Sequence, residues 1–210
     1  MDANIERLLS EYDERSAAEW RRAEELGTKA FGSRDEMLLA VGRATGQLLN
    51  ILVRESKARS ILELGTSYGY SAVWLAEAAR DTGGRVVTTE VAANKSQFAR
   101  EKLASVGLES YVDFKVGDAV QLLEALPGPF DFVLVDLWKD LYVPCFERFV
   151  DKLADGAIVV ADNMLFPEMS RPYANAYRAR VRKSGRFDTV LLPVGSGIEV
   201  SRYRGWGSSD

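Results

Sequence analysis

Short apolar runs recur along the chain from residue 60 onward, and stretches with helical periodicity separate them. These runs predict strands near residues 60–64, 85–90, 111–116, 131–136 and 156–161, with helices between them. Such alternation is typical of an α/β fold, in which helices cover both faces of a mostly parallel sheet. Two further apolar stretches, 188–194 and 197–203, have no helix between them. The glycines at 195 and 197 predict an antiparallel hairpin there, which brings the sheet to seven strands.

The part of the chain before residue 57 is predicted to be helical. Ile5, Leu8, Leu9 and Tyr12 share one helical face, and residues 44–54 form another amphipathic run. No repeat or linker divides the chain, so we expect one domain over residues 1–210, with N-terminal helices in 1–56 and an α/β core in 57–210. The helices can either cover a pocket or form a homodimer interface.

Charge and composition favour small-molecule partners. The 210 residues contain 27 Lys and Arg against 31 Asp and Glu, so the net charge of −4 gives no general attraction to nucleic acid. Residues 171–186 contain six basic and no acidic side chains. This run can either receive a phosphorylated substrate or form a solvated helix face opposite Tyr173, Tyr177 and Val181, and we favour the solvated face.

The chain has no histidine, which excludes His-based triads, His acid–base pairs and His-containing zinc sites. Catalysis is left to carboxylates, lysine, tyrosine or a hard metal ion. Cys145 is the only cysteine, so no intrachain disulfide can form. Without a leader-like start or an apolar run of membrane-spanning length, we expect a cytoplasmic protein that does not enter a membrane.

The segment from residue 61 to residue 76 is the most informative. A predicted buried strand ends at Glu63, the chain turns through Gly65 and Gly69, and a helix follows from about Ser71. The first turn of that helix presents free N–H groups to an anion, and Glu63 can bind a cation beside it. A ligand with both charges fits best, and S-adenosylmethionine (SAM) is an amino acid joined to adenosine.

A dinucleotide fits this turn less well, although it is not excluded. The GxGxxG fingerprint needs a second glycine near the pyrophosphate, and this chain has Ser67 there. Glu90 ends the next strand about 20 residues after the turn, where a carboxylate reaches ribose hydroxyls in both cofactor classes. A purely structural corner, with Glu90 as a solvated strand end, is the other possibility.

Polar residues follow two later strands. Asp136 comes after the run at 130–135, and Asp162 and Asn163 follow the run at 157–161. If these strands are neighbours, two carboxylates and an amide oxygen converge at the edge where open α/β sheets bind ligands. Such a donor set predicts a magnesium-like ion. Alternatively, these side chains cap loops and bind neighbouring backbone.

Lys139 is the candidate general base. It follows Asp136 by three residues, and lysines beside a bound cation or partly removed from water lose their proton more readily. The alternative is a surface lysine paired with Asp140.

Together, these motifs resemble class I SAM-dependent O-methyltransferases, and most closely the catechol O-methyltransferase branch. The similarity covers about residues 41–203. It rests on the segments GQLLNILVRE, LELGTSYGYSAV, TTEV, VDLWKDLY and VADN, which occur in that order. The resemblance implies a Rossmann-like methyltransferase fold.

The resemblance also implies roles for individual residues. Glu63 and Ser71 would hold the amino and carboxylate groups of SAM, and Glu90 would bind its ribose. The other implied cofactor contacts are Val41, Gly65, Asp118, Ala119, Asp136 and Trp138. The implied magnesium ligands are Asp136, Asp162 and Asn163, and Lys139 would be the catalytic base.

The implied acceptor site departs from that of the catechol enzymes. Met37 stands where they have a gating tryptophan, Leu39 at the next wall position, and Leu137 in place of a histidine. Their glutamate that contacts the second hydroxyl has no clear counterpart between residues 187 and 194. Pro167 matches a substrate-wall proline, and Lys139 and Asn163 would also contact the acceptor. The acceptor can therefore differ from a simple catechol.

The implied activity is Mg²⁺-dependent methyl transfer from SAM to a hydroxyl of a small aromatic acceptor. Three alternatives stay open. One is a metal-independent SAM methyltransferase, and another is a nicotinamide oxidoreductase that uses Lys139 and a tyrosine such as Tyr142. The last is a SAM-binding module without catalytic activity.

Overall fold

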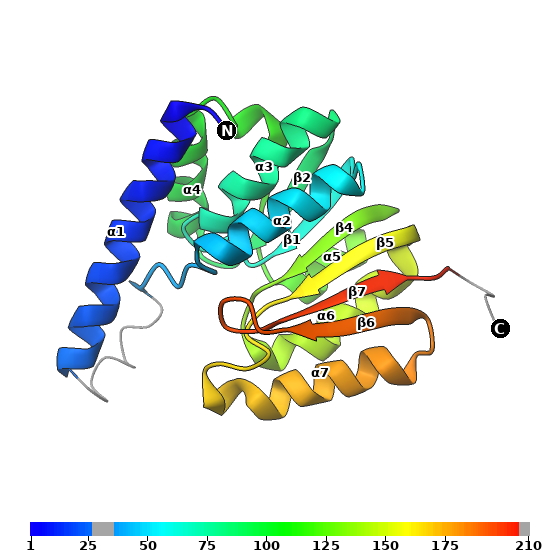
Figure 1. Ribbon diagram of the computed structural model, residues 1–210. Coiled ribbons are helices and arrows are strands. Elements are labelled where there is room, and N and C mark those ends of the chain that lie inside the picture. The colour runs from blue at the N-terminus through cyan, green and yellow to red at the C-terminus, as the bar shows by residue number, and fades with distance from the viewer. Residues whose placement is uncertain (27–35, 206–210) are drawn as a thin grey trace.

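One sheet of seven strands, in the order β3-β2-β1-β4-β5-β7-β6, organises the structure (Figure 1). The computed structural model describes residues 1–26 and 36–205. Strands β1 to β5 are parallel, and β7 is antiparallel to both β5 and β6. The strands are β1 (Ser60–Leu64), β2 (Arg85–Glu90), β3 (Val112–Val116), β4 (Phe130–Val135), β5 (Leu153–Ala161), β6 (Phe187–Leu192) and β7 (Ile198–Tyr203). The predicted α/β fold with a C-terminal hairpin is confirmed.

Helices cover both faces of this sheet. The helices α1 to α4 lie on one side and α5 to α7 on the other (Figure 1). They are α1 (Ala3–Leu26), α2 (Arg43–Glu55), α3 (Tyr70–Thr82), α4 (Ala93–Ser105), α5 (Ala119–Ala125), α6 (Tyr142–Phe149) and α7 (Arg171–Lys183). Two short 3₁₀ turns, η3 (Lys139–Leu141) and η5 (Glu168–Ser170), precede α6 and α7.

Alternating side chains of the central strands divide the core between these two faces. Ile61 and Leu134 belong to the cluster under α1 to α4, whereas Leu62 and Val133 belong to the cluster under α5 to α7. Because both sets are apolar, β1 and β4 are continuous hydrophobic runs in the sequence, as expected for strands buried on both faces.

Strand β5 begins at Leu153, three residues before the predicted start at 156. Gly156 lies inside the strand with a φ of 81°, and the pairing with β4 shifts register between Phe130 and Phe132. Because of this irregularity, the strand continues through Gly156, although a glycine in the sequence predicts a strand boundary.

The N-terminal helices are tied to the sheet domain by buried apolar and charged contacts. The predicted face of Ile5, Leu8, Leu9 and Tyr12 is buried. Arg43, at the start of α2, contacts Glu6 and Asp13 of α1 at 2.6 and 2.9 Å. Within residues 1–26 and 36–205, no helix has the length and hydrophobicity needed to cross a membrane.

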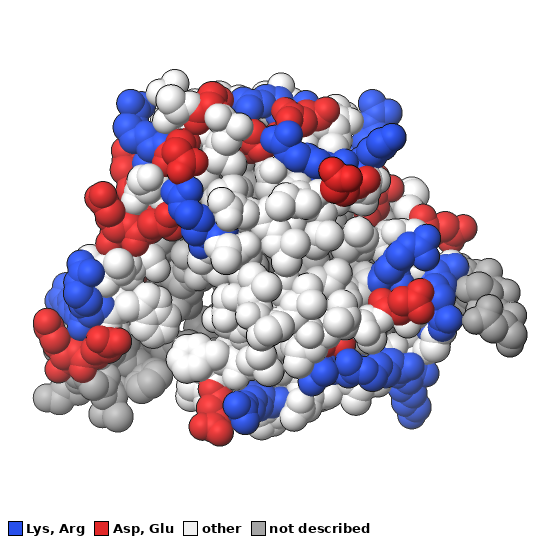
Figure 2. Space-filling view, in the orientation of Figure 1, with Lys and Arg blue, Asp and Glu red and all other residues white. Residues whose placement is uncertain are grey.

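The basic run of residues 171–186 forms the row of blue side chains along α7 at the lower edge of Figure 2. Arg178 and Arg182 both bind Glu199, which is fully buried, at 2.8 and 2.7 Å. Arg180 pairs with Glu147 at 3.0 Å. These ion pairs support the helix-face interpretation. The apolar-face prediction was wrong for Tyr173, which is 48% exposed because it lies in the first turn of α7, whereas Tyr177 and Val181 are buried.

Candidate active site

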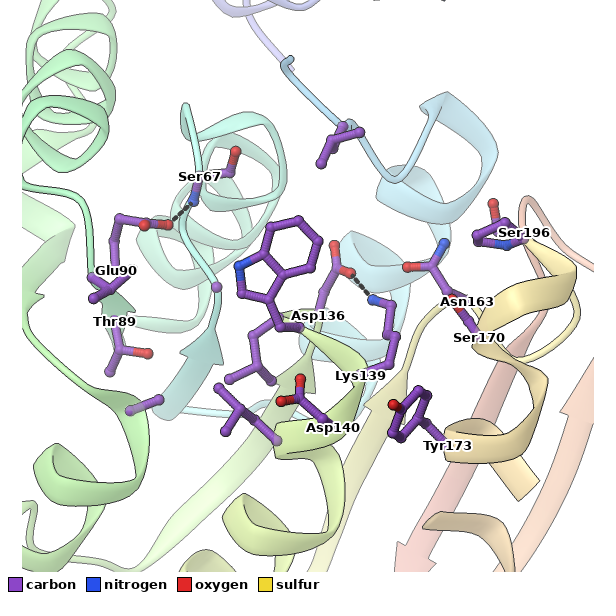
Figure 3. A pocket seen from close by; sticks show the side chains of 18 of the residues that line it. Ser67, Thr89, Glu90, Asp136, Lys139, Asp140, Asn163, Ser170, Tyr173 and Ser196 are labelled. Carbon is purple, nitrogen blue, oxygen red and sulfur yellow. Dashed lines mark hydrogen bonds and ion pairs between the residues drawn. The ribbon is translucent and has the colours of Figure 1, made fainter. Parts of the chain in front are cut away.

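A cavity of about 560 Å³ opens at the carboxyl ends of β1, β2, β4 and β5 (Figure 3). This is the edge of the sheet where ligands bind in open α/β folds. Ten residues that the sequence analysis selected line it: Leu39, Gly65, Glu90, Asp118, Ala119, Asp136, Trp138, Lys139, Asn163 and Pro167.

Gly65 allows the turn after β1 to touch the end of β4. Its φ is 104°, and a Cβ atom there would lie 2.0 Å from the backbone oxygen of Asp136. Gly69, with a φ of 95°, precedes the first residue of α3. The two glycines therefore bring the start of α3 and Asp136 to the same point of the cavity.

Glu63 lies behind this turn as a buried carboxyl with one unpartnered oxygen. Its Oε2 atom accepts a hydrogen bond from the Thr88 hydroxyl at 2.5 Å, and among the described residues Oε1 has no partner. Burial raises the pKa of Glu63 to about 7, against the lowering effect of the Ser71 and Thr88 hydroxyls. A cationic ligand group beside it would offset this desolvation.

Glu90 is held in place by two backbone donors. The N–H groups of Ser67 and Ala92 donate to its two carboxylate oxygens at 2.8 and 2.9 Å (Figure 3). Ser67 adopts a φ of 48°, which aims its N–H at Glu90. Asp118 accepts a hydrogen bond from the Gln121 N–H at 2.9 Å and so caps α5 at the cavity wall.

A chain of hydrogen bonds connects the ends of β4 and β5. The Lys139 ammonium donates to Asp136 Oδ1 at 3.1 Å and to the Tyr142 hydroxyl at 2.7 Å. Tyr142 donates in turn to the backbone oxygen of Asp162 at 3.1 Å. The ion pair of Lys139 is therefore with Asp136, across the cavity wall, and the alternative pairing with Asp140 was wrong.

Asp162 is the second carboxylate of this group. It is 2% exposed, and its Oδ1 atom has no partner in the part of the chain that the structure describes. Burial and the nearby Asp136 raise the pKa of Asp162 to about 7. Asn163 follows in a left-handed conformation, with a φ of 57°, and its side chain points into the cavity (Figure 3).

These residues fit a hard divalent cation in their donor chemistry. No group of three or more His, Cys, Asp and Glu side chains able to hold a metal occurs in residues 1–26 and 36–205. The candidate set consists instead of two carboxylates and one amide, and cations such as Mg²⁺ complete such sets with water. The unpartnered oxygen of Asp162 is the observation that favours a cation here.

Five selected residues do not line the main cavity. Val41 and Ser71 line a small adjoining recess, which shares Gly65 and Asp136 with the cavity. Glu63 and Asp162 are buried beneath the surface of the site. Met37, expected at the acceptor wall, is also buried and does not reach the cavity.

The cavity also contains residues that the sequence analysis did not select. They are mainly Trp20, Ser67, Thr89, Lys95, Phe166, Met169, Ser170, Tyr173 and Ser196. Ser67 and Thr89 adjoin selected residues and follow from the strand-end rule. Trp20, Phe166, Met169, Ser170 and Tyr173 gave no signal as site residues, because only the tertiary fold brings them to the cavity.

Comparison with known proteins identifies the family. A family model described as O-methyltransferase matches residues 13–204. Catechol O-methyltransferase of Mus musculus is 31% identical over 193 residues, which cover 85% of this chain and 71% of the mouse protein. Catechol O-methyltransferase of Niastella koreensis is 34% identical over 60% of this chain, and the match spans 59% of that relative's length.

Solved structures agree with this match. The O-methyltransferase TomG of Streptomyces achromogenes, which is involved in tomaymycin synthesis and was solved with SAM, superposes with a TM-score of 0.77. It is 27% identical, with 98% of this chain and 91% of that chain covered. The nicotinamide alternative is not supported by any of these matches. The resemblance deduced from the motifs is confirmed, and the chain belongs to the SAM-dependent O-methyltransferase family, in its catechol O-methyltransferase-like branch.

Proposed function

We propose that this protein transfers the methyl group of SAM to a hydroxyl of a small aromatic acceptor with the help of a divalent cation such as Mg²⁺. The observation that carries this proposal is the grouping of Asp136, Lys139 and Asp162 beside the Gly65 turn. Asp136 contacts the cofactor turn and Lys139, and Tyr142 connects Lys139 to Asp162. This arrangement is suited to an acceptor that must lose a proton.

The charges of the residues on the cofactor side of the cavity support SAM as its ligand. Glu63 would take the amino group of its methionine part, and Ser71, in the first turn of α3, would take the carboxylate. Glu90 would bind the ribose hydroxyls, since it lines the cavity and two backbone N–H groups fix its carboxylate there. Asp118, Ala119 and Trp138 would surround the adenine, with Val41 and Gly65 nearer the methionine part.

The acceptor side would hold the hydroxyl near Lys139. Lys139, as the neutral amine left once its ammonium has released a proton to solvent, would take the hydroxyl proton, and the oxygen would then form a bond to the methyl carbon as the bond from that carbon to sulfur breaks. Asp136, Asp162 and Asn163 would hold the cation. When bound, a divalent cation there supplies positive charge that stabilises a phenolate and fixes its orientation. Leu39 and Pro167 would flank the acceptor ring.

Methyl transfer without a metal is the second candidate. It is favoured by the contact between Lys139 and Asp136 at 3.1 Å, which already gives this carboxylate a cationic partner. In that case Asp162 would be a buried structural acid whose pKa is raised by burial and by Asp136.

A methyl-transfer assay with SAM separates these candidates. The acceptor panel contains catechols, caffeoyl-type esters and monophenols, each measured with Mg²⁺ and with EDTA. We expect turnover of a compound with two adjacent oxygens, lost in EDTA and restored by Mg²⁺. Asp162→Ala should lose the metal-dependent turnover and retain SAM binding by calorimetry. Full activity of this variant in EDTA would contradict the metal role, and the absence of transfer to any phenol would contradict the proposal as a whole.

A further inference from the structure

Large apolar side chains that are exposed to solvent concentrate around the cavity. Among the described residues, eleven such side chains are exposed, and six of them line this one cavity. They are Trp20, Val91, Trp138, Phe166, Met169 and Tyr173, with exposures between 42 and 68%. Exposed apolar groups that gather at one place mark a binding surface, whereas scattered ones need no explanation.

Three of these side chains come from one segment beside Asn163 and Lys139. Phe166 and Met169 precede α7, and Tyr173 lies in its first turn, with its ring directed toward Lys139 (Figure 3). Trp20 of α1 lines the same cavity from the N-terminal helices. The acceptor side of the cavity therefore offers apolar surface beyond the polar groups near Lys139.

The backbone of this segment is anchored. The N–H groups of Leu165 and Phe166 both donate to the Ser196 oxygen at 3.0 Å, and the Met164 N–H donates to the Gly197 oxygen at 2.8 Å. Leu165 packs so closely on Gly197 that a Cβ atom there would lie 2.5 Å from it. The backbone that carries Phe166 is thus fixed, and a ligand that packs on Phe166 loses little affinity to ordering it.

The charges at this end disfavour an anionic ligand. Lys139 already donates to Asp136 and Tyr142. Asp140 lines the same cavity. The other lining lysine, Lys95, is on α4 after β2, with its ammonium 5.5 Å from the Tyr68 ring. No arginine lines the cavity among the described residues. An acidic tail near Asp140 would therefore meet another carboxylate, and the described part of the lining offers it no arginine.

We propose that the acceptor is an apolar aromatic molecule larger than catechol and without an anionic tail. Its hydroxyl lies at Lys139, and its apolar remainder packs on Phe166, Met169 and Tyr173. This inference rests on the proposed function and narrows it, since it separates neutral, extended phenols from acidic phenols and from thioesters of coenzyme A.

A homologous series of catechols tests this size and charge preference. The compounds carry methyl, propyl or hexyl at position 4, and matched compounds end the same chains in a carboxylate. Caffeoyl-CoA provides a larger anionic probe. At saturating SAM and Mg²⁺, we expect kcat/KM to rise by up to about fourfold per methylene, and the carboxylate compounds to be at least about tenfold slower than their neutral partners.

Variants of Phe166 and Met169 test whether these side chains cause the preference for longer alkyl chains. Phe166→Ala with Met169→Ala should lower the ratio of kcat/KM for hexylcatechol over methylcatechol by about tenfold or more. Val190→Ala is the control, because Val190 is 51% exposed on β6 and does not line the cavity, and the ratio should not change.

The outcomes are distinct. Methylation of catechols with no dependence on chain length, or with a preference for carboxylates or caffeoyl-CoA, would overturn this inference and leave the proposed function intact. An unchanged ratio in the double variant would also overturn it. Failure to methylate any phenol would overturn both.

Discussion

Glu63 and Glu77 are both buried, but they differ in what surrounds their carboxylates. Glu77 accepts hydrogen bonds from Arg54 and Asn50 at 2.6 and 2.7 Å. Burial raises the pKa of Glu77, but these hydrogen bonds outweigh it and lower the pKa below its ordinary value. Glu63 has only hydroxyl partners, and burial raises its pKa to about 7. This asymmetry favours Glu63 over Glu77 as a carboxyl that a cationic ligand group would neutralise.

Replacing Glu63 with glutamine should change how stability depends on pH. Between pH of about 4.5 and 7 the folded state holds a proton on Glu63 that the unfolded state has lost. The free energy of unfolding therefore falls as pH rises through this window, by up to about 3 kcal/mol. In Glu63→Gln this fall should be absent. The difference in unfolding free energy, variant minus wild type, should therefore be more positive at pH 8 than at pH 5. Urea unfolding without ligand measures it.

The same variant should bind SAM more weakly, since the amide carries no charge for the amino group. Glu77→Gln is the matched control, and it should lose stability at pH 8 because the buried ion pair between Arg54 and Glu77 is lost. Parallel pH profiles for wild type and Glu63→Gln would contradict the assignment.

Lys139 allows a test of the base. Lys139→Met should lower kcat by about 10² to 10⁴ and leave SAM affinity unchanged in calorimetry. Lys139→Arg keeps a cation beside Asp136, but a guanidinium does not release its proton. Activity close to wild type in the arginine variant would show that this position supplies only charge. The distinction requires the kcat of both variants across a pH series.

At the scale of elements, the site exists because the ends of two strands meet. Gly65 of the β1 turn contacts the Asp136 backbone at the end of β4, and this contact leaves no room for a side chain. Gly107 has a positive φ without such a contact. With a φ of 72°, it ends the turn after α4 and has open space at its Cβ position.

Two alanine substitutions separate backbone strain from this contact. Gly107→Ala should cost about 1 to 2 kcal/mol of unfolding free energy, from the left-handed backbone alone. Gly65→Ala adds overpacking against Asp136, so we expect about 3 kcal/mol or more and loss of SAM binding. Chemical denaturation and calorimetry measure both effects. Equal costs in the two variants would show that the contact has no special importance.

The sequence predicted elements where a periodic pattern exists and missed sites where it does not. Asp136, Asp162 and Asn163 were found because each follows an apolar run, and parallel strands end at one edge of a sheet. Phe166 and Met169 lie in an irregular segment and a 3₁₀ turn, where no periodicity indicates which way a side chain points. Met37 was placed by resemblance alone, and its position in the fold is a buried one.

At the scale of the whole molecule, helix α1 connects both halves of the site. The Tyr12 hydroxyl donates to the Tyr68 oxygen at 2.6 Å, and the Tyr70 hydroxyl donates to Asp13 at 2.7 Å. These contacts flank Gly69, where α3 begins. Trp20, further along α1, lines the cavity. Helix α1 thus contacts the cofactor turn and contributes Trp20 to the lining of the same cavity.

Ligand binding should stabilise the whole fold. SAM at a hundred times its Kd adds about 2.7 kcal/mol to the free energy of unfolding. For a chain of this size that corresponds to a rise in Tm of about 5 to 11 °C. Scanning fluorimetry with SAM, with NADH and with SAM plus EDTA measures this rise in Tm. A shift with NADH, or none with SAM, would contradict the assignment of the cofactor side, whereas EDTA should have no effect.

The attachment of α1 to the cofactor turn has an energetic consequence. Any displacement of Tyr68 and Tyr70 that accompanies SAM binding would reach α1 through Tyr12 and Asp13, and Trp20 lies on the same helix at the cavity. The affinities for methyl donor and acceptor would then be coupled, and thermodynamic reciprocity requires each to change the other by the same factor. Substituting Tyr12, which lines neither the cavity nor the adjoining recess, would reduce that cooperativity.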